Sequence, residues 1–200
     1  SKVVDIVTKA VDRDRTILVS SAISGCTDTL IKIGNLASQR DESYKDLINE
    51  LQQKHHEIIS SLLPREKQEE STEVCDSLFD SLRSIAQGVY LLGELSPASL
   101  DAIQSFGELW SSKIIATKLA SIGLATKWID SRQIIRTVAK GDKNTVDIQK
   151  TYYRVNEMVE NNNITQLFVL PGFIASDKQG RTTTLGRGGS DYTASLLAVG

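Results

Sequence analysis

The sequence predicts an α/β fold with a mostly parallel sheet, interrupted by a helical insertion at about residues 38–105. Three observations support this prediction. A short, nearly uncharged run near the N-terminus leads through small residues into a helix, which is half of a βαβ unit. Three helical patterns then follow one another with almost no strand signal between them. Strand patterns return after about residue 124 and alternate with a further helix.

Length and composition indicate one ordinary domain without nucleic-acid or membrane partners. Of the 200 residues, 40% are hydrophobic and 24% are charged, and the formal net charge is −2, so no basic excess suggests nucleic-acid binding. The longest nearly apolar run, LFVLPGFIA, is too short to span a membrane. We expect no signal peptide, because the charged first segment lacks an apolar core. Cys26 and Cys75 are expected to be reduced, buried thiols, as in a cytoplasmic protein, and no metal site is predicted.

The first elements are expected to be a helix and a buried strand. Apolar residues recur on one helical face from Val3 to Val11. The run TILVSSAI (16–23) has few charges, as a buried parallel strand does. Small residues follow, and Thr27 or Asp28 is predicted to cap the next helix.

The middle of the chain is predicted to be almost entirely helical. Apolar residues at a 3-4 spacing mark one helix over 41–63 and a second over 74–92. The charged stretch PREKQEESTE (64–73) is interpreted as a solvated segment that joins these two helices. A third helix is expected to run from Ser96, its N-cap, to about Gly123.

Strand signals return in the last third of the chain. ATKWID (125–130) and QIIRT (133–137) are predicted to be strands, and a helix with Tyr152 and Met158 on its apolar face follows. The run TQLFVLPGFIASDKQGRTTTLG (165–186) predicts a buried strand, a bend at Pro-Gly and a hairpin that turns at DKQG.

The sharpest functional signal is GRGGSD (186–191), at the start of the last predicted helix. Its spacing fits neither the dinucleotide fingerprint G-x-G-x-x-G nor a Walker loop. Glycines nonetheless let a backbone approach a ligand, and amides at a helix N-terminus favour an anion. Arg187 adds a cation whose fork geometry suits a carboxylate. Asp191 is expected to cap the helix, grip a cation or orient a lysine; the alternative is a plain glycine turn with a surface arginine and a capping aspartate.

Two other stretches contain candidate ligand groups. Ser21 and Thr27 follow a predicted strand at the edge where α/β sheets bind ligands, so their hydroxyls could donate to a carboxylate. Helix capping and close packing are the alternative for both. Glu108 lies between Phe106 and Trp110, so its carboxylate must face water, pair with a cation or bind a positive group. Taken alone, a solvated helix face is the simpler interpretation.

In this order, these stretches resemble the aspartokinases of the amino acid kinase superfamily. The resemblance covers most of the chain and rests on ILVSSAISGCTDTL (17–30), SFGELWSSKIIA (105–116), WIDSRQIIRT (128–137) and, above all, PGFIASDKQGRTTTLGRGGSDYTASLLA (171–198). It implies a partial three-layer α/β/α sandwich with the amino-acid site in its N-terminal half. The implied activity is transfer of the ATP γ-phosphoryl group to the β-carboxylate of L-aspartate, with Mg²⁺, as the first step of lysine, threonine and methionine biosynthesis.

The resemblance also implies a role for each candidate residue. Arg187 would hold the substrate α-carboxylate, and Glu108 would receive the substrate ammonium group. Thr27 and Ser21 would contact the substrate carboxylates. Asp191 would organise the catalytic centre rather than act as a base, since a carboxylate nucleophile needs no deprotonation. The backbone amides that would line the substrate and the transferring phosphoryl group belong to Gly188, Gly189 and Ser190.

Two parts of the aspartokinase pattern do not occur in these 200 residues. They are the K-F-G-G-T strand and loop, whose lysine contacts the phosphates, and the T-D and D-P-R segments that hold ATP. The chain thus resembles the amino-acid-binding part of an aspartokinase, either stand-alone or joined to a homoserine dehydrogenase. We expect the parent protein to be an allosteric, homo-oligomeric, cytoplasmic kinase, and residues 1–200 alone to be inactive. A non-catalytic amino-acid-sensing module, or a kinase of another acidic amino acid, is the alternative.

Overall fold

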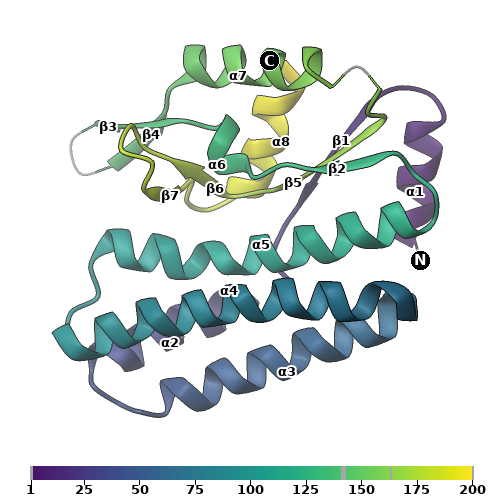
Figure 1. Cartoon of the computed structure of the whole chain (residues 1–200). Coiled ribbons are helices and arrows are strands. Elements are labelled where there is room, and N and C mark those ends of the chain that lie inside the picture. The colour runs from purple at the N-terminus through teal and green to yellow at the C-terminus, as the bar shows by residue number, and fades with distance from the viewer. Residues whose placement is uncertain (1, 141–142, 163, 200) are drawn as a thin grey trace. The chain divides into compact units, whose positions relative to one another are not determined.

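The computed structural model describes residues 2–140, 143–162 and 164–199, and the chain divides into two compact units. Ser1–Ser21 and Ser111–Gly200 make up an α/β unit, and Ala22–Trp110 make up a helical unit. The chain passes from one unit to the other after Ser21 and again within one helix, α5 (Pro97–Ser121). Figure 1 shows the elements in chain order.

The α/β unit is built on a three-stranded parallel sheet. Its strands, in spatial order, are β1 (Thr16–Ser20), β5 (Leu167–Pro171) and β2 (Thr126–Trp128). Every residue of β5 is buried, as expected of a central strand that is covered on both faces. The strands predicted at TILVSSAI, ATKWID and LFVLP are therefore confirmed.

Helices cover both faces of this sheet, which confirms the three-layer arrangement. Phe168 and Leu170 of β5 share a core with α6, α7 and α8. Leu167 and Val169, which alternate with them, share a second core with α1 and the second half of α5. Besides the second half of α5, the covering helices are α1 (Lys2–Val11), α6 (Ser131–Ile134), α7 (Ile148–Glu160) and α8 (Gly189–Val199).

Two antiparallel hairpins complete the α/β unit. The first joins β6 (Ile174–Ser176) to β7 (Thr182–Thr184) across the DKQG turn, as predicted. The second joins β3 (Thr137–Lys140) to β4 (Lys143–Val146) and was not predicted from the sequence.

The strand predicted at QIIRT is wrong over most of its length. Gln133 and Ile134 lie in the short helix α6 instead. Asp130 begins this helix, because its carboxylate accepts a hydrogen bond from the Arg132 amide at 3.0 Å. A side-chain cap of this kind outweighs the strand preference of two isoleucines.

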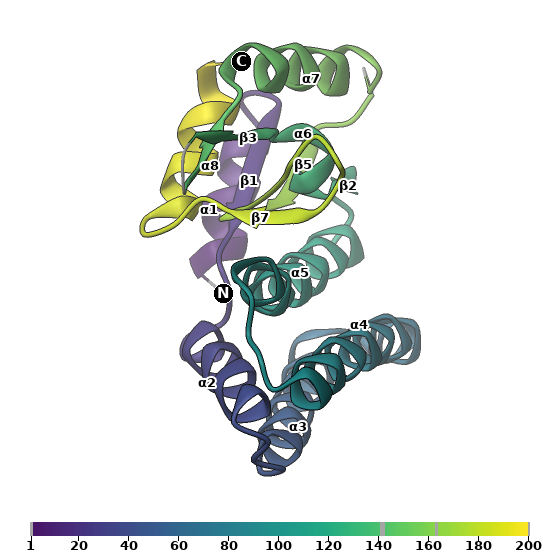
Figure 2. The ribbon, with the colours of Figure 1, turned by 90° about the vertical axis from the view of Figure 1, so that its left-hand side faces the viewer.

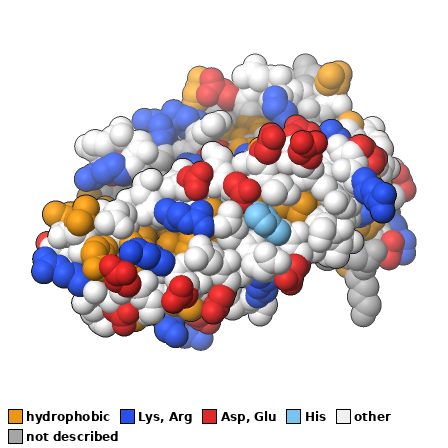
Figure 3. All heavy atoms as spheres, turned by 60° about the horizontal axis from the view of Figure 1, so that its bottom comes forward, with side chains coloured by type: hydrophobic (Ala, Val, Ile, Leu, Met, Phe, Trp, Pro, Cys, Tyr) orange, Lys and Arg blue, Asp and Glu red, His pale blue; other side chains and the backbone are white. Residues whose placement is uncertain are grey.

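The helical unit consists of α2 (Cys26–Ser38), α3 (Tyr44–Leu62), α4 (Arg65–Leu92) and the first half of α5. The first three helices pack against one another, and Ser96 caps α5 by accepting a bond from the Ser99 amide at 3.1 Å, as predicted. The buried core includes Leu30, Ile33, Ile48, Leu51, Phe79 and Leu82. On the face shown in Figure 3, charged side chains of both signs are interspersed.

Two details of the helical prediction are wrong. α2 begins at Cys26, after Gly25, so neither Thr27 nor Asp28 is its N-cap. Gly25 has a φ of 78°, a left-handed conformation that favours glycine. The charged stretch 64–73 is not a connecting segment but the beginning of α4, and its polar side chains cover the outer side of that helix.

The bend after β5 packs tightly against the start of α8. A Cβ on Gly172 would lie 2.9 Å from the Cα of Ser190, and a Cβ on Gly189 would lie 2.7 Å from the Phe173 ring. The Phe173 amide donates a hydrogen bond to the Thr193 hydroxyl at 3.1 Å. Figure 2 shows the chain leaving β7 and turning into α8 within the same unit.

We expect Gly172→Ala to destabilise the protein, because the new Cβ would collide with backbone that cannot move without shifting α8. Overpacking of this kind costs about 1–3 kcal/mol in the free energy of unfolding, which urea unfolding measures. Gly88→Ala is the matched control. Gly88 lies within α4, a Cβ there would meet open space, and alanine is favoured over glycine in a helix by about 1 kcal/mol. Equal stabilisation by both changes would contradict the tight contact.

Candidate functional site

The predicted site residues are divided between the two units. Ser21 and the turn 186–191 belong to the α/β unit, whereas Thr27 and Glu108 belong to the helical unit. Contacts within each unit determine how its own residues are held.

The α/β unit gathers polar groups at the carboxyl ends of its parallel strands. The Gly172 amide, just after β5, donates to the Ser20 carbonyl at the end of β1 (2.8 Å). The Ser131 hydroxyl, which follows β2, donates to the Pro171 carbonyl. Ser21 is exposed beside these strand ends. Open α/β sheets bind ligands at this edge, and the structure therefore places Ser21 where a ligand could reach it.

The turn that precedes α8 exposes Arg187 between two left-handed glycines. Gly186 has a φ of 73° and Gly188 a φ of 74°, while a Cβ on either would meet nothing within 4 Å. Both positions therefore favour glycine for its backbone conformation and not for lack of space. Gly189 is different, because it is buried and packs against Phe173.

The three amides predicted to line a ligand are not equivalent. The Gly189 amide donates to the Gly186 carbonyl at 3.0 Å, so it is already engaged within the turn. For the amides of Gly188 and Ser190, no hydrogen bond to another described residue exists. Asp191 is exposed in the first turn of α8, where a negative side chain is stabilised by the helix dipole.

Glu108 is buried, and its interpretation as part of a solvated helix face is wrong. The side chain is 4% exposed, and its Oε1 accepts a hydrogen bond from the Ala22 amide at 3.3 Å. Burial raises the pKa of this carboxyl from 4.5 to about 7, although hydrogen bonds from backbone amides act in the opposite direction. The reason is that residues 105–112 of α5 are all buried, so the helix has no solvent face there. A buried carboxylate of this kind favours a positive partner.

Gly107 explains how Glu108 reaches the Ala22 amide. A Cβ on Gly107 would lie 2.9 Å from the Cβ of Ala22 and 3.4 Å from the Sγ of Cys26, so α5 approaches this loop closely. Burial, and secondly the charge of Glu108, raises the pKa of the Cys26 thiol to about 12. Thr27 follows directly in the first turn of α2 and is half-buried.

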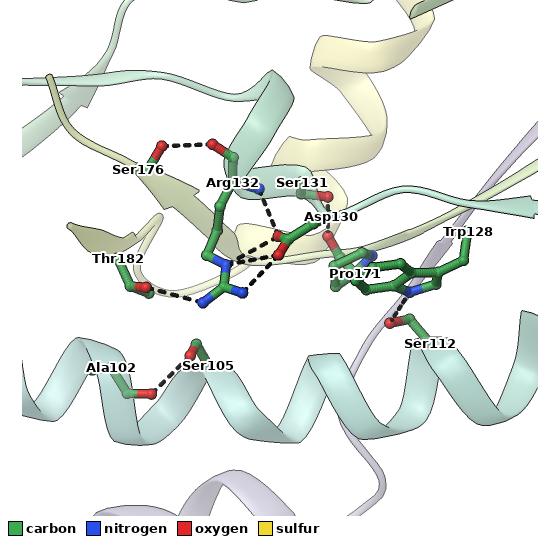
Figure 4. A network of polar contacts seen from close by, with 10 residues as sticks. All are labelled: Ala102, Ser105, Ser112, Trp128, Asp130, Ser131, Arg132, Pro171, Ser176 and Thr182. Carbon is green, nitrogen blue, oxygen red and sulfur yellow. Dashed lines mark hydrogen bonds and ion pairs between the residues drawn. The ribbon is translucent and has the colours of Figure 1, made fainter. Parts of the chain in front are cut away.

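Three charged side chains near these elements were not identified from the sequence. The Lys54 Nζ of α3 donates to the Ser24 carbonyl at 3.2 Å, in the loop that precedes Thr27. No local pattern could have indicated it, because the two residues are thirty positions apart in the chain. Asp130 and Arg132 form an ion pair of 2.6 Å after β2 (Figure 4). Asp130 is a residue type that favours the N-cap position, which is a signal of the helix start that could have been noticed.

Other kinds of site are not seen in the described ranges. Within them, no group of three or more His, Cys, Asp or Glu side chains could hold a metal ion. Cys26 and Cys75 are buried and form no disulfide, and burial raises the pKa of Cys75 to about 12. None of the described helices combines the length and apolar character that crossing a membrane requires.

The chain is similar in sequence to aspartokinases. It is 32% identical over 197 residues to lysine-sensitive aspartokinase 3 of Escherichia coli, and the aligned region covers 94% of this chain and 40% of that protein. It is 27% identical over 190 residues to the chloroplastic bifunctional aspartokinase/homoserine dehydrogenase 1 of Arabidopsis thaliana, and the aligned region covers 94% of this chain and 21% of that protein. The chain thus spans less than half the length of these relatives.

Solved structures and a family model agree with this similarity. E. coli aspartokinase III in complex with aspartate and ADP (R-state) superposes with a TM-score of 0.81 at 30% identity, over 98% of this chain and 42% of that one. The same enzyme in complex with lysine and aspartate (T-state) gives a TM-score of 0.84 at 28% identity, over 98% and 43%. The model of the amino acid kinase family matches residues 1–200, and the chain therefore belongs to that family.

Proposed function

We propose that the protein containing this chain is an aspartate kinase, which transfers the γ-phosphoryl group of ATP to the β-carboxylate of L-aspartate. This reaction would be the first step of lysine, threonine and methionine biosynthesis. The observation that carries the proposal is the exposed Arg187 between two left-handed glycines at the start of α8. The similarity to aspartokinases, one of which was solved with aspartate and ADP, supports it. Residues 1–200 would form the amino-acid-binding part of the catalytic domain, with a helical insertion at about 38–105.

The proposed substrate carries a charge for each of two protein groups. Arg187 would hold the α-carboxylate through charge-assisted hydrogen bonds. Glu108 would receive the ammonium group, because a positive charge stabilises a carboxylate that is buried away from water. The hydroxyls of Ser21 and Thr27 would donate to the substrate carboxylates.

The start of α8 would stabilise the transferring phosphoryl group. The amides of Gly188 and Ser190 support this role because no described residue accepts their hydrogen bonds, whereas the Gly189 amide would have to leave Gly186 to contribute. Asp191 would organise the centre without taking a proton. ATP is the proposed phosphoryl donor, and Mg²⁺ would supply charge neutralisation when bound with it. Catalysis would then depend mostly on positioning and on neutralising phosphate charge.

The proposal extends to the full-length protein. We propose an allosteric homo-oligomer, since one relative is described as lysine-sensitive and E. coli aspartokinase III has been solved in R and T states. The homo-oligomer itself rests on the family resemblance alone. The buried thiols of Cys26 and Cys75 suit a reducing compartment and support a cytoplasmic location.

A hydroxylamine-trapping assay of the full-length protein tests the proposed reaction. ATP, Mg²⁺ and one amino acid are supplied, and the acyl phosphate is trapped as a coloured hydroxamate. We expect product with L-aspartate and little with L-glutamate or N-acetyl-L-glutamate. If only L-glutamate or N-acetyl-L-glutamate gave product, the proposed substrate would be wrong. Ligand binding without any product would favour a sensing module. Residues 1–200 alone should give no product.

Arg187→Ala should weaken L-aspartate binding to the full-length protein. Loss of charge-assisted hydrogen bonds worth about 1.5–3 kcal/mol lowers the affinity roughly 10- to 150-fold. Isothermal titration calorimetry measures this change. Arg181→Ala is the matched control, since Arg181 is also exposed and lies on the same segment but pairs with Asp177 at 2.7 Å. The assignment of Arg187 fails if both variants bind L-aspartate like the unaltered protein.

Aspartate binding should strengthen as the pH rises from about 6 to 8. Only the ionised carboxylate of Glu108 can receive an ammonium group, and the pKa of this carboxyl is about 7. Affinity should therefore fall up to about tenfold per pH unit below 7 and level off above it, with about half a proton released per aspartate at pH 7. Calorimetry in buffers of different ionisation enthalpy counts these protons. Glu108→Gln keeps an acceptor for the Ala22 amide but should abolish the proton release; a pH-independent affinity in the unaltered protein would contradict the role.

Stability without ligand gives an independent measurement of the same carboxyl. Its pKa is about 7 in the folded chain and 4.5 in an exposed reference, so the folded state holds the proton more tightly. The contribution of this proton to the stability of the fold is complete below pH 4.5 and is lost as the pH rises to about 7. At pH 8, Glu108→Gln should therefore raise the free energy of unfolding, by roughly 2–3 kcal/mol. Urea unfolding at pH 5 and pH 8 checks the sign.

A further inference from the structure

We infer that Arg132, held in place by Asp130, is a positioning residue that fixes the hairpin from which Arg187 is presented. Neither residue is among the candidate ligand groups, and both lie in α6 and the loop before it. The kinetic consequence rests on the proposed function, whereas the structural consequence does not.

Asp130 holds the Arg132 guanidinium in one orientation. The Arg132 Nε donates to both carboxylate oxygens, at 3.0 and 3.1 Å, and Nη2 donates to Oδ2 at 2.6 Å. The Asp130 side chain is 12% exposed, so water screens this pair less than a surface ion pair. Asp130 also caps α6, which fixes the carboxylate itself. Figure 4 shows the two side chains facing each other.

Arg132 contacts both strands of the β6–β7 hairpin. Its Nη1 donates to the Thr182 hydroxyl at 3.2 Å, at the first residue of β7. Its carbonyl accepts a hydrogen bond from the Ser176 hydroxyl at 2.5 Å, at the last residue of β6. An arginine can bind Asp130 and Thr182 at the same time because its five donors form a rigid fork, which a lysine lacks.

β7 connects the contact with Arg132 to the turn that carries Arg187, because the strand ends only a few residues before that turn. The strand ends at Thr184, and the Leu185 amide donates to the Phe173 carbonyl at 2.8 Å. Gly186 and Arg187 follow directly. The guanidinium of Arg132 therefore acts on the first residue of a three-residue strand whose end leads into the turn.

α6 is also held in the fold by contacts other than the ion pair. The Ser131 hydroxyl bonds the Pro171 carbonyl, and Ile134 and Ile135 are buried in the core of the unit. The contact with Thr182 is therefore the specific contribution of the Arg132 side chain. A residue that acts through another in this way should change substrate binding more than stability.

A double-mutant cycle in the full-length protein tests the inference. Thr182→Val removes the hydroxyl and leaves the ion pair intact, and Arg132→Gln removes the guanidinium. We expect each change to lower kcat/KM for L-aspartate roughly tenfold while the KM for ATP stays within about twofold. The double variant should be no worse than Arg132→Gln, because both changes break one contact. If Arg132→Gln does not fold, the effect of Thr182→Val on kcat/KM for L-aspartate tests the inference by itself.

Hydrogen exchange gives a measurement that does not depend on the substrate. The amides of residues 182–191 should exchange faster in both variants, with no change in β5. Lys178→Gln is the control, since this exposed lysine lies in the turn between β6 and β7 and should alter neither exchange over 182–191 nor kinetics. Unchanged exchange over 182–191 overturns the inference, and so does faster exchange throughout the α/β unit with a lowered Tm. If the protein does not phosphorylate L-aspartate, the proposed function fails and the exchange result alone decides the inference.

Discussion

The contact between the bend after β5 and the first turn of α8 is the constraint on which the α/β site depends. β5 is buried along its whole length, so its end cannot shift without disturbing both cores of the unit. Gly172 brings that end against Ser190, and Gly189 brings α8 against Phe173. The turn that carries the exposed Arg187 leads directly into this fixed helix. The packing at these two glycines therefore holds the end of the turn in place.

Much of this fold could be predicted from the sequence, because buried faces of helices and strands require apolar residues at regular spacings. α3 has apolar residues at helical spacing, α5 begins with a capping Ser-Pro pair, and β5 is a short apolar run that ends at a Pro-Gly bend. The glycine turn was also predictable as a structure, since Gly-Arg-Gly-Gly requires left-handed backbone or close packing. The roles of its residues could not be predicted from the residues alone, and they follow from the resemblance to aspartokinases.

The features that could not be predicted depend on contacts distant in sequence. Glu108 reads as a surface residue because a charged group on a helix ordinarily faces water, and nothing local shows that α5 is buried on all sides there. The cap of α2 was missed because a left-handed Gly25 competes with good capping side chains. The run QIIRT has strand-forming residues, but the carboxylate of Asp130 three residues earlier turns the chain into α6. In each case tertiary structure overrides a local preference.

Glu108 and Arg187, the two charged residues proposed to recognise the substrate, differ in the step at which their free-energy cost arises. Glu108 is desolvated on folding, and this burial raises its pKa to about 7, so the cost of holding the carboxylate away from water arises when the chain folds. Arg187 is exposed, so its side chain is hydrated and free to rotate until a ligand orders it, at about 2 kcal/mol of rotamer entropy. In the proposed function, selection of the ammonium group is therefore prepared by the fold of the helical unit. Selection of the carboxylate is completed only on binding, which is why a rigid support for the turn beneath Arg187 matters.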